Sequence, residues 1–186
     1  MDKPFAITLD VGSSLANKTG TWRTERPVYQ NGLPPCNDAC PAGENIQGWL
    51  YDAEEGRYED AWRVLVRDNP FPAIMGRVCY HPCQTACNRA QLDQPVGINS
   101  VERFLGDAAL REGWQFDPAP PATGKRVLVI GAGPSGLSAA YHLRRAGHMV
   151  VVRDAGPKPG GMMRFGIPAY RLPRDVLDAE IRRVLH

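Results

Sequence analysis

The chain has 186 residues, which is room for one ordinary domain or two small ones. Its formal net charge at pH 7 is +2. Hydrophobic residues make up 43% of it, and its Lys and Arg residues are scattered rather than clustered, which is typical of a soluble globular protein with no nucleic-acid partner. No apolar run reaches the roughly 18 residues of a membrane span, and the first residues do not resemble a signal peptide. We therefore expect a cytoplasmic protein with no membrane partner.

The first part of the chain is expected to be mainly helical after an extended arm. Residues 1–33 show no hydrophobic period, apart from one short strand expected at residues 5–9. Apolar residues recur at helical spacing in residues 46–54 and 58–67, which predicts a helix in each. Ser100 is the expected N-cap of a third helix that ends near Gly113 and carries an apolar stripe of Val101, Phe104, Leu105, Ala108 and Ala109.

Cysteines lie in two short clusters within this helical part. They are Cys36 and Cys40, followed by Cys79, Cys83 and Cys87. Thiols at such short spacings can ligate one metal ion or cluster, and an odd number of them argues against a pure disulfide framework. Zinc ribbons usually have gaps of two residues, whereas every gap here has three, so an iron–sulfur cluster is favoured over zinc. The alternative is that the cysteines are buried and inert, and His81 between them is interpreted as structural.

The segment at residues 117–124 is rich in proline and predicts a linker. The expected order after it is a strand at residues 127–130, a helix at 135–146 and a strand at 150–152. Both strands are continuous apolar runs, which predicts a parallel sheet buried on both faces. The second part of the chain is therefore expected to begin an α/β Rossmann-like domain.

A glycine-rich turn joins the first of these strands to the helix. Its first glycine, Gly131, can make the tight turn, Gly133 allows the backbone to approach a pyrophosphate, and Gly136 allows close packing of helix and strand. Asp154 follows the second strand, 23 residues after Gly131, where an acidic residue binds ribose hydroxyls. The turn predicts a dinucleotide site that also includes Ala132, Pro134 and Ser135, without distinguishing FAD from NAD(P).

Several segments together resemble a known family. They are Pro35-Cys36-Asn-Asp-Ala-Cys40-Pro41, Gly76-Arg-Val-Cys79-Tyr-His-Pro-Cys83-Gln-Thr-Ala-Cys87, Val96-Gly-Ile-Asn-Ser-Val-Glu102 and Lys158-Pro-Gly160-Gly161-Met-Met-Arg-Phe-Gly166-Ile-Pro168-Ala-Tyr-Arg171-Leu-Pro173. This combination is similar to the glutamate synthase small (β) subunit family, whose helical Fe–S domain is shared by the N-terminal part of dihydropyrimidine dehydrogenase. The resemblance implies a [4Fe–4S] domain at residues 34–116 and the start of an FAD domain at residues 125–186. It further implies that Gly161, Met162 and Arg171 contribute to the FAD site and that NADPH binds beyond this chain.

The same resemblance implies the cluster ligands. Cys40, Cys79 and Cys83 would share one [4Fe–4S] cluster, with Glu102 as the fourth ligand unless Cys36 or Cys87 replaces it. A second cluster in relatives uses positions 28, 31, 36 and 87, but this chain has Val28 and Asn31 at the first two. We therefore expect one cluster and no second one.

The expected function is that of an electron-transferring Fe–S flavoprotein oxidoreductase subunit. It would pass electrons between NAD(P)H, FAD and the cluster to a larger catalytic subunit, and no residue is expected to be a catalytic acid or base. The alternatives are a ferredoxin or a 2-oxoacid:ferredoxin oxidoreductase as partner, or a metal-bound docking module without redox activity. Because the chain ends before a complete nucleotide-binding sheet has formed, we expect an N-terminal fragment that is inactive alone.

Overall fold

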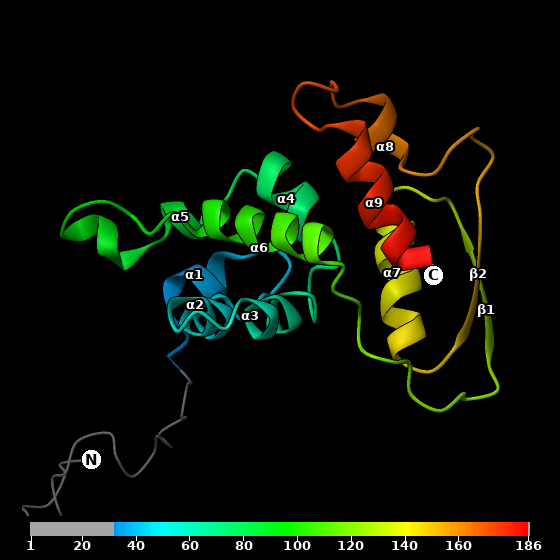
Figure 1. Ribbon diagram of the computed structural model, residues 1–186, viewed down its shortest axis with the longest axis horizontal. Coiled ribbons are helices and arrows are strands. Elements are labelled where there is room, and N and C mark those ends of the chain that lie inside the picture. Colours follow the sequence, from blue (N-terminus) through cyan, green and yellow to red (C-terminus); the bar gives the residue numbers. More distant parts are fainter. Residues whose placement is uncertain (1–31, 186) are drawn as a thin grey trace, which may run out of the picture. The chain divides into compact units, whose positions relative to one another are not determined.

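The computed structural model describes residues 32–185 (Figure 1). The strand expected at residues 5–9, most of the expected arm, Val28 and Asn31 lie outside the described residues. The helical part contains α1 (Pro35–Ala39), α2 (Ile46–Glu54), α3 (Tyr58–Leu65), α4 (Pro72–Val78), α5 (Pro82–Thr85), the short 3₁₀ helix η3 (Asn88–Gln91) and α6 (Ile98–Glu112).

The three helices predicted from periodicity are present, with two corrections. Ser100 is not an N-cap: α6 begins at Ile98, and the Asn99 N–H at its start is bonded instead by Gln84 Oε1 at 2.8 Å. Phe104 is not part of the buried stripe, because it lies on the outer side of α6 and packs edge-on against Tyr58. The stripe is otherwise buried at Leu105, Ala108 and Ala109, with Val101 at its edge.

Helix α4 packs so closely against α6 that the backbones of the two helices are in contact. A Cβ atom on Gly106 would lie 2.3 Å from the Ala73 nitrogen, and one on Gly76 would lie 2.5 Å from the Arg103 Cα. Two glycines therefore allow the helices to approach more closely than side chains would permit. This packing fixes α4, and with it the chain that follows α4, against the middle of α6.

The second part begins with a βαβ unit. Strands β1 (Arg126–Ile130) and β2 (Met149–Arg153) are parallel and joined by α7 (Pro134–Arg145). Two further helices follow, α8 (Gly161–Phe165) and α9 (Arg174–Leu185). The predicted fold class is confirmed: a mainly helical domain precedes the start of a Rossmann-like unit. None of the helices that the structure describes combines the length and hydrophobicity needed to cross a membrane.

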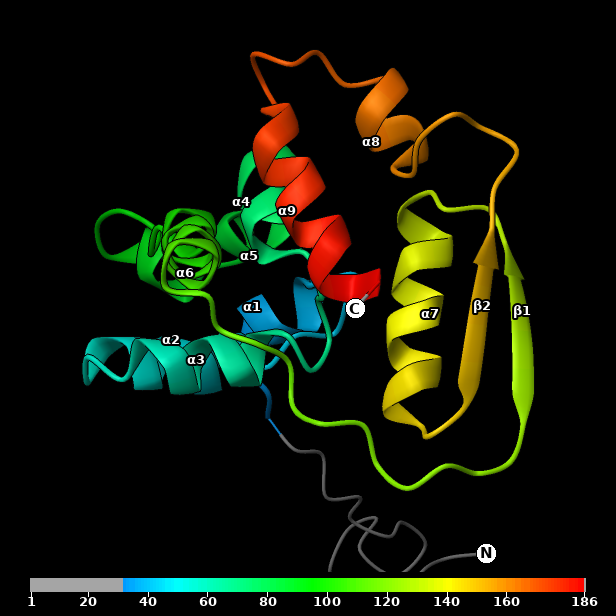
Figure 2. The same ribbon diagram turned by 45° about the vertical axis from the view of Figure 1, so that its right-hand side comes forward.

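The prediction that both strands are buried is wrong. Figure 2 shows α7 alongside β1 and β2, and residues of α7 fill one face of the pair. On the other face Leu128 and Ile130 are 59% and 83% exposed, and Met149 and Val151 are exposed as well. No element of residues 32–185 covers that face. In this part of the chain the apolar runs correctly predicted the strands, but the strands are not buried on both faces.

Helix α9 connects the two parts of the chain. In Figure 2 it lies between α4 and α7. One hydrophobic cluster contains Phe71 and Ile74 from the start of α4, Leu137 of α7, and Leu177 and Ile181 of α9. The helical part and the nucleotide-binding unit therefore share a core in the described part of the chain.

Candidate functional site

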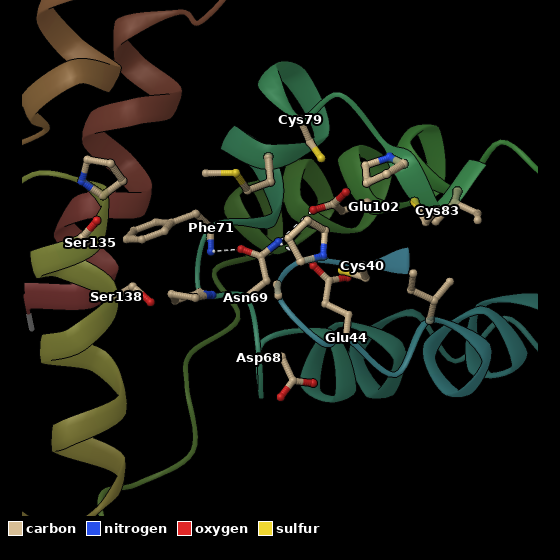
Figure 3. Close-up of a pocket in the computed structure, with 18 residues that line it drawn as sticks. Cys40, Glu44, Asp68, Asn69, Phe71, Cys79, Cys83, Glu102, Ser135 and Ser138 are labelled. Carbon is tan, nitrogen blue, oxygen red and sulfur yellow. Dashed lines mark hydrogen bonds between the residues drawn. The ribbon is translucent and has the colours of Figure 1, made fainter. Parts of the chain in front are cut away.

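Cys40, Cys79, Cys83 and Glu102 are among the residues that line a single cavity of about 380 Å³. Cys40 directly follows α1, Cys79 directly follows α4, Cys83 lies in α5 and Glu102 lies in α6. Figure 3 shows these four side chains arranged around the same space. The structure thus brings together, from four elements, the residues that the resemblance implied as ligands of one cluster.

A tight turn places Cys79 and Cys83 around this cavity. Between them His81 adopts a left-handed conformation with φ of 45°, after which Pro82 starts α5. The His81 backbone N–H donates a hydrogen bond to the Cys79 Sγ at 3.2 Å. Hydrogen bonds to ligand sulfurs tune the potential of Fe–S clusters, so this backbone N–H would act on a cluster that Cys79 ligates.

Two of the thiols, Cys83 and Cys40, are held in an environment that disfavours their ionised form. Burial, together with the smaller effects of neighbouring Cys40, Cys79 and Glu102, raises the pKa of Cys83 to about 11. Burial also raises the pKa of Cys40. Several acidic groups that repel one another when ionised require a compensating positive charge, which iron ions of a cluster provide.

A buried polar group that sequence reasoning missed adjoins the thiols. Asn69 Nδ2 donates hydrogen bonds to Glu102 Oε1 at 2.8 Å and to Glu44 Oε1 at 3.0 Å. All three residues are buried, and burial raises the pKa of Glu102 to about 9 and also raises that of Glu44. Asn69 and Glu44 were not marked by any spacing or periodicity in the sequence, whereas Glu102 had been named through the family resemblance.

The donor set fits a cluster better than a single ion. Within residues 32–185 no three His, Cys, Asp or Glu side chains are gathered closely enough to hold one metal ion. The thiols of Cys40, Cys79 and Cys83 instead line a cavity of about 380 Å³. Three thiols and one buried carboxyl group supply four donors, which suits a [4Fe–4S] cluster.

The other two cysteines lie apart from this cavity. Cys36 is partly buried against the core of the helical part, and neither it nor Cys87 is among the residues that line the cavity. Hydrogen bonds from backbone N–H groups, led by that of Val96, lower the pKa of Cys87. Of the three residues considered for the fourth position, only Glu102 lines the cavity, and its ligation of a cluster stays a prediction.

The glycine-rich loop has the geometry of a phosphate-binding turn. Gly131 has φ of 102°, and a Cβ atom on Gly136 would lie 1.8 Å from the Gly131 carbonyl oxygen. Around Gly133 a Cβ atom would meet only the Gly161 Cα, at 3.8 Å, so the loop is open on that side. No side chain caps the N-terminus of α7, which leaves its first N–H groups available to phosphate oxygens.

The side chain of Asp154 is held by backbone N–H groups, one of which belongs to the glycine-rich loop. Its two carboxylate oxygens accept hydrogen bonds of 2.6 Å from the Ala132 and Gly156 N–H groups, which lower the pKa of the carboxyl group. Asp154 therefore shapes the loop, and its binding to a ribose stays a prediction.

The predicted FAD residues further along the chain lie in two positions. Gly161 packs its backbone against the loop, since a Cβ atom there would lie 2.8 Å from the Gly133 Cα, and the preceding Gly160 N–H bonds to the Ala132 carbonyl at 2.7 Å. Met162 and Arg171 have exposed side chains. Their contribution to FAD binding stays a prediction.

The cavity of the thiols extends to the nucleotide-binding unit. Pro134, Ser135 and Ser138 at the start of α7 line it together with the cysteines. Phe71 lies between these serines and the cysteines in Figure 3. The candidate cluster site and the candidate nucleotide site are therefore neighbours across one cavity.

Comparison with known families agrees with this arrangement. Residues 15–114 match the family described as dihydropyrimidine dehydrogenase domain II, 4Fe-4S cluster. The chain belongs to this family. Residues 129–178 match an NAD(P)-binding Rossmann-like domain. The predicted cofactor classes, a [4Fe–4S] cluster and a dinucleotide, are confirmed at the level of the family.

Relatives among characterised proteins confirm the predicted resemblance to glutamate synthase small subunits. The chain is 40% identical over 152 residues to the glutamate synthase [NADPH] small chain of Mycobacterium tuberculosis, covering 81% of this chain and 31% of that protein. It is 37% identical over 172 residues to the NADP(+)-dependent formate dehydrogenase subunit beta of Moorella thermoacetica, covering 81% of this chain and 24% of the relative. It is 38% identical over 154 residues to the NADPH-Fe(3+) oxidoreductase subunit beta of Geobacter sulfurreducens, covering 79% of this chain and 22% of that relative. The chain thus spans less than a third of these relatives.

Proposed function

We propose that the chain is part of an electron-transferring Fe–S flavoprotein oxidoreductase that passes electrons between NAD(P)H, FAD and an iron–sulfur cluster to a partner protein. Cys40, Cys79, Cys83 and Glu102 hold one [4Fe–4S] cluster in this proposal. The glycine-rich loop, residues 131–136, holds the pyrophosphate of FAD. When bound, the flavin exchanges hydride equivalents and the cluster carries single electrons.

One observation carries the proposal: the candidate ligands and the start of α7 line the same cavity. Electron transfer between two cofactors requires that they lie close together, and a shared cavity supports that. The chain itself would hold both groups and exclude water, because Phe71, Ile98 and Met75 give the cavity a largely apolar wall.

We infer that the partner is a larger catalytic subunit. Three relatives are named as components of a glutamate synthase, a formate dehydrogenase and an Fe(3+) oxidoreductase, so similar chains serve different reactions. A ferredoxin is the alternative partner. Co-purification of the protein from its source under anaerobic conditions distinguishes the two by the size of the protein retained.

Iron and acid-labile sulfide assays on anaerobically prepared protein test the cluster. We expect about four of each per chain, together with iron–sulfur absorption that Cys83→Ser abolishes while any flavin absorption remains. Cys36→Ser and Cys87→Ser are the matched controls and should leave iron and sulfide unchanged, because neither residue lines the cavity. A value near eight would show a second cluster, and a colourless zinc protein would refute electron transfer.

A further inference from the structure

Asn69 lies beside the candidate ligands without being one of them. It stands in the short segment between α3 and α4 and is buried. All of its side-chain hydrogen-bonding groups are used. Its two Nδ2 hydrogens go to Glu102 Oε1 and Glu44 Oε1, and its Oδ1 accepts the Phe71 backbone N–H at 3.0 Å.

These contacts fix the orientation of the Asn69 amide. If the amide were turned over, its NH₂ would face the N–H of Phe71 and that hydrogen bond would be lost, and its oxygen would repel both carboxyl groups whenever they are ionised. Proline follows at positions 70 and 72, which restricts the backbone on both sides of Phe71. The amide is therefore a rigid donor at a fixed place in the cavity wall.

The fixed amide constrains Glu102 in turn. Its Oε1 is held by Asn69 at 2.8 Å, whereas its Oε2 has only a long contact of 3.4 Å with Asn99 Nδ2. Figure 3 shows the carboxyl group of Glu102 directed into the space between the cysteines. One oxygen is thus anchored to protein, and the other keeps its electron pairs for a group in the cavity.

We propose that Asn69 is a positioning residue that anchors one oxygen of Glu102 so that the other oxygen ligates the cluster. This role rests on the proposed function, because it requires a cluster held by the three cysteines. Glu44 accepts the second Nδ2 hydrogen of Asn69, and this hydrogen bond holds the amide in the orientation that faces Glu102. Hydrogen-bond partners of a metal ligand typically change metal affinity by 10- to 100-fold when removed.

A double-mutant cycle with Asn69→Leu and Glu102→Ala tests the role. Asn69→Leu keeps the approximate side-chain volume and removes both hydrogen bonds to the carboxyl groups. We expect iron to be lost to a chelator about 10- to 100-fold faster, with a changed electron paramagnetic resonance spectrum and reduction potential that match those of Glu102→Ala. In the Glu102→Ala background, Asn69→Leu should add no further change in spectrum or potential.

Glu44→Gln is the matched control, because its Oε1 still accepts from Asn69; it should keep the wild-type spectrum. If Asn69→Leu does not fold by circular dichroism, Asn69→Ala makes the same test, since it removes the donors to both carboxyl groups without adding a charge beside them. A wild-type spectrum in the Asn69 variant, or an undiminished effect in the Glu102→Ala background, overturns the positioning role. Unaltered protein without iron and sulfide would instead overturn the proposed function.

Discussion

Glu180 and Ile74 are joined by a hydrogen bond of 2.9 Å from the Ile74 backbone N–H to Glu180 Oε2, although they lie 106 residues apart in the chain. The other oxygen of Glu180 accepts the Ala73 N–H at 3.0 Å, and the side chain is fully buried. These N–H groups belong to the first turn of α4, where helix geometry leaves them without partners. Helix α9 therefore holds the start of the helix whose end leads to Cys79.

Replacing Glu180 by Ala should lower the free energy of unfolding by about 2–4 kcal/mol, because it leaves two buried N–H groups unpaired and opens a cavity. Urea denaturation at pH 6 measures the change. Asp175→Ala on the same helix is the control; its side chain is exposed in the first turn of α9, so its loss should cost less than about 1 kcal/mol. Equal effects of the two substitutions would contradict a special role for the Glu180 contacts.

Glu180 should also make stability depend on pH. Burial raises the pKa of Glu180 to about 7 from its ordinary 4.5, against the opposing effects of the bonded N–H groups and of Arg183 and Arg77. Between these values the folded chain binds more protons than the unfolded chain, so stability falls as pH rises and levels off above about pH 7.

Comparison with Glu180→Ala cancels most of the effect of the other buried carboxyl groups, Glu44 and Glu102, which are present in both proteins; the Glu180 charge contributes only a smaller part of the raised pKa of Glu102. The stability difference between the two proteins should shrink by up to roughly 3 kcal/mol from pH 4.5 to pH 7. Urea midpoints measured in steps across this range provide the check. A difference that stays constant or grows with pH contradicts a raised pKa.

The sequence pointed to the candidate site more directly than to its surroundings. The spacing of the cysteines and the glycine turn indicated where a cluster and a dinucleotide could bind, and the family resemblance alone singled out Cys40, Cys79 and Cys83, which the structure places around one cavity. Short helices such as α4 and α5 were missed, because each has too few residues to show a period and begins at a proline. Asn69, Glu44 and Glu180 were missed because only the tertiary structure buries them.

The close contact of α4 and α6 predicts that Gly106→Ala disrupts the cluster site. Its methyl group would lie 2.3 Å from the Ala73 nitrogen, so the helices must separate and Cys79 must move away from Glu102. We expect a loss of at least about 2 kcal/mol in unfolding free energy and a fall in iron content per chain.

Gly97→Ala is the control for this prediction, because a methyl group there meets nothing closer than Ser100 at 3.8 Å and φ is −74°. It should change stability by less than about 1 kcal/mol. Normal iron content in Gly106→Ala would show that the helices can separate without loss of the ligand geometry.

Two glycines of the nucleotide loop should have separable roles. Gly136→Ala would place a methyl group 1.8 Å from the Gly131 oxygen, so it should destabilise the βαβ unit by at least about 2 kcal/mol. Gly133→Ala meets nothing closer than 3.8 Å and should alter stability by less than about 1 kcal/mol. Because the second glycine lets a pyrophosphate approach, Gly133→Ala should still weaken FAD binding about tenfold or more in fluorescence titrations. Unchanged FAD affinity in this folded variant would contradict pyrophosphate binding at the loop.

Removal of the cluster should loosen the helical part more than the βαβ unit. The ligands Cys40 and Cys79 lie on segments about forty residues apart, so a cluster that joins them adds its binding energy to folding. The helical part, at roughly 80 residues, has a small core and depends more on such a crosslink. We therefore expect Cys83→Ser, or an iron chelator under anaerobic conditions, to reduce helix content and to expose residues 34–115 to limited proteolysis.

The segment from Lys125 onward serves as the internal reference, because β1, α7 and β2 contribute no residue to the cysteine ligand set. Its cleavage should change less than that of residues 34–115. However, α9 bonds to α4 through Glu180, so cleavage within α9 should rise together with that of α4 rather than with that of the strands. An identical cleavage pattern and circular dichroism spectrum after cluster removal would show that the apolar core around Trp49 and Trp62 holds the helical part without help.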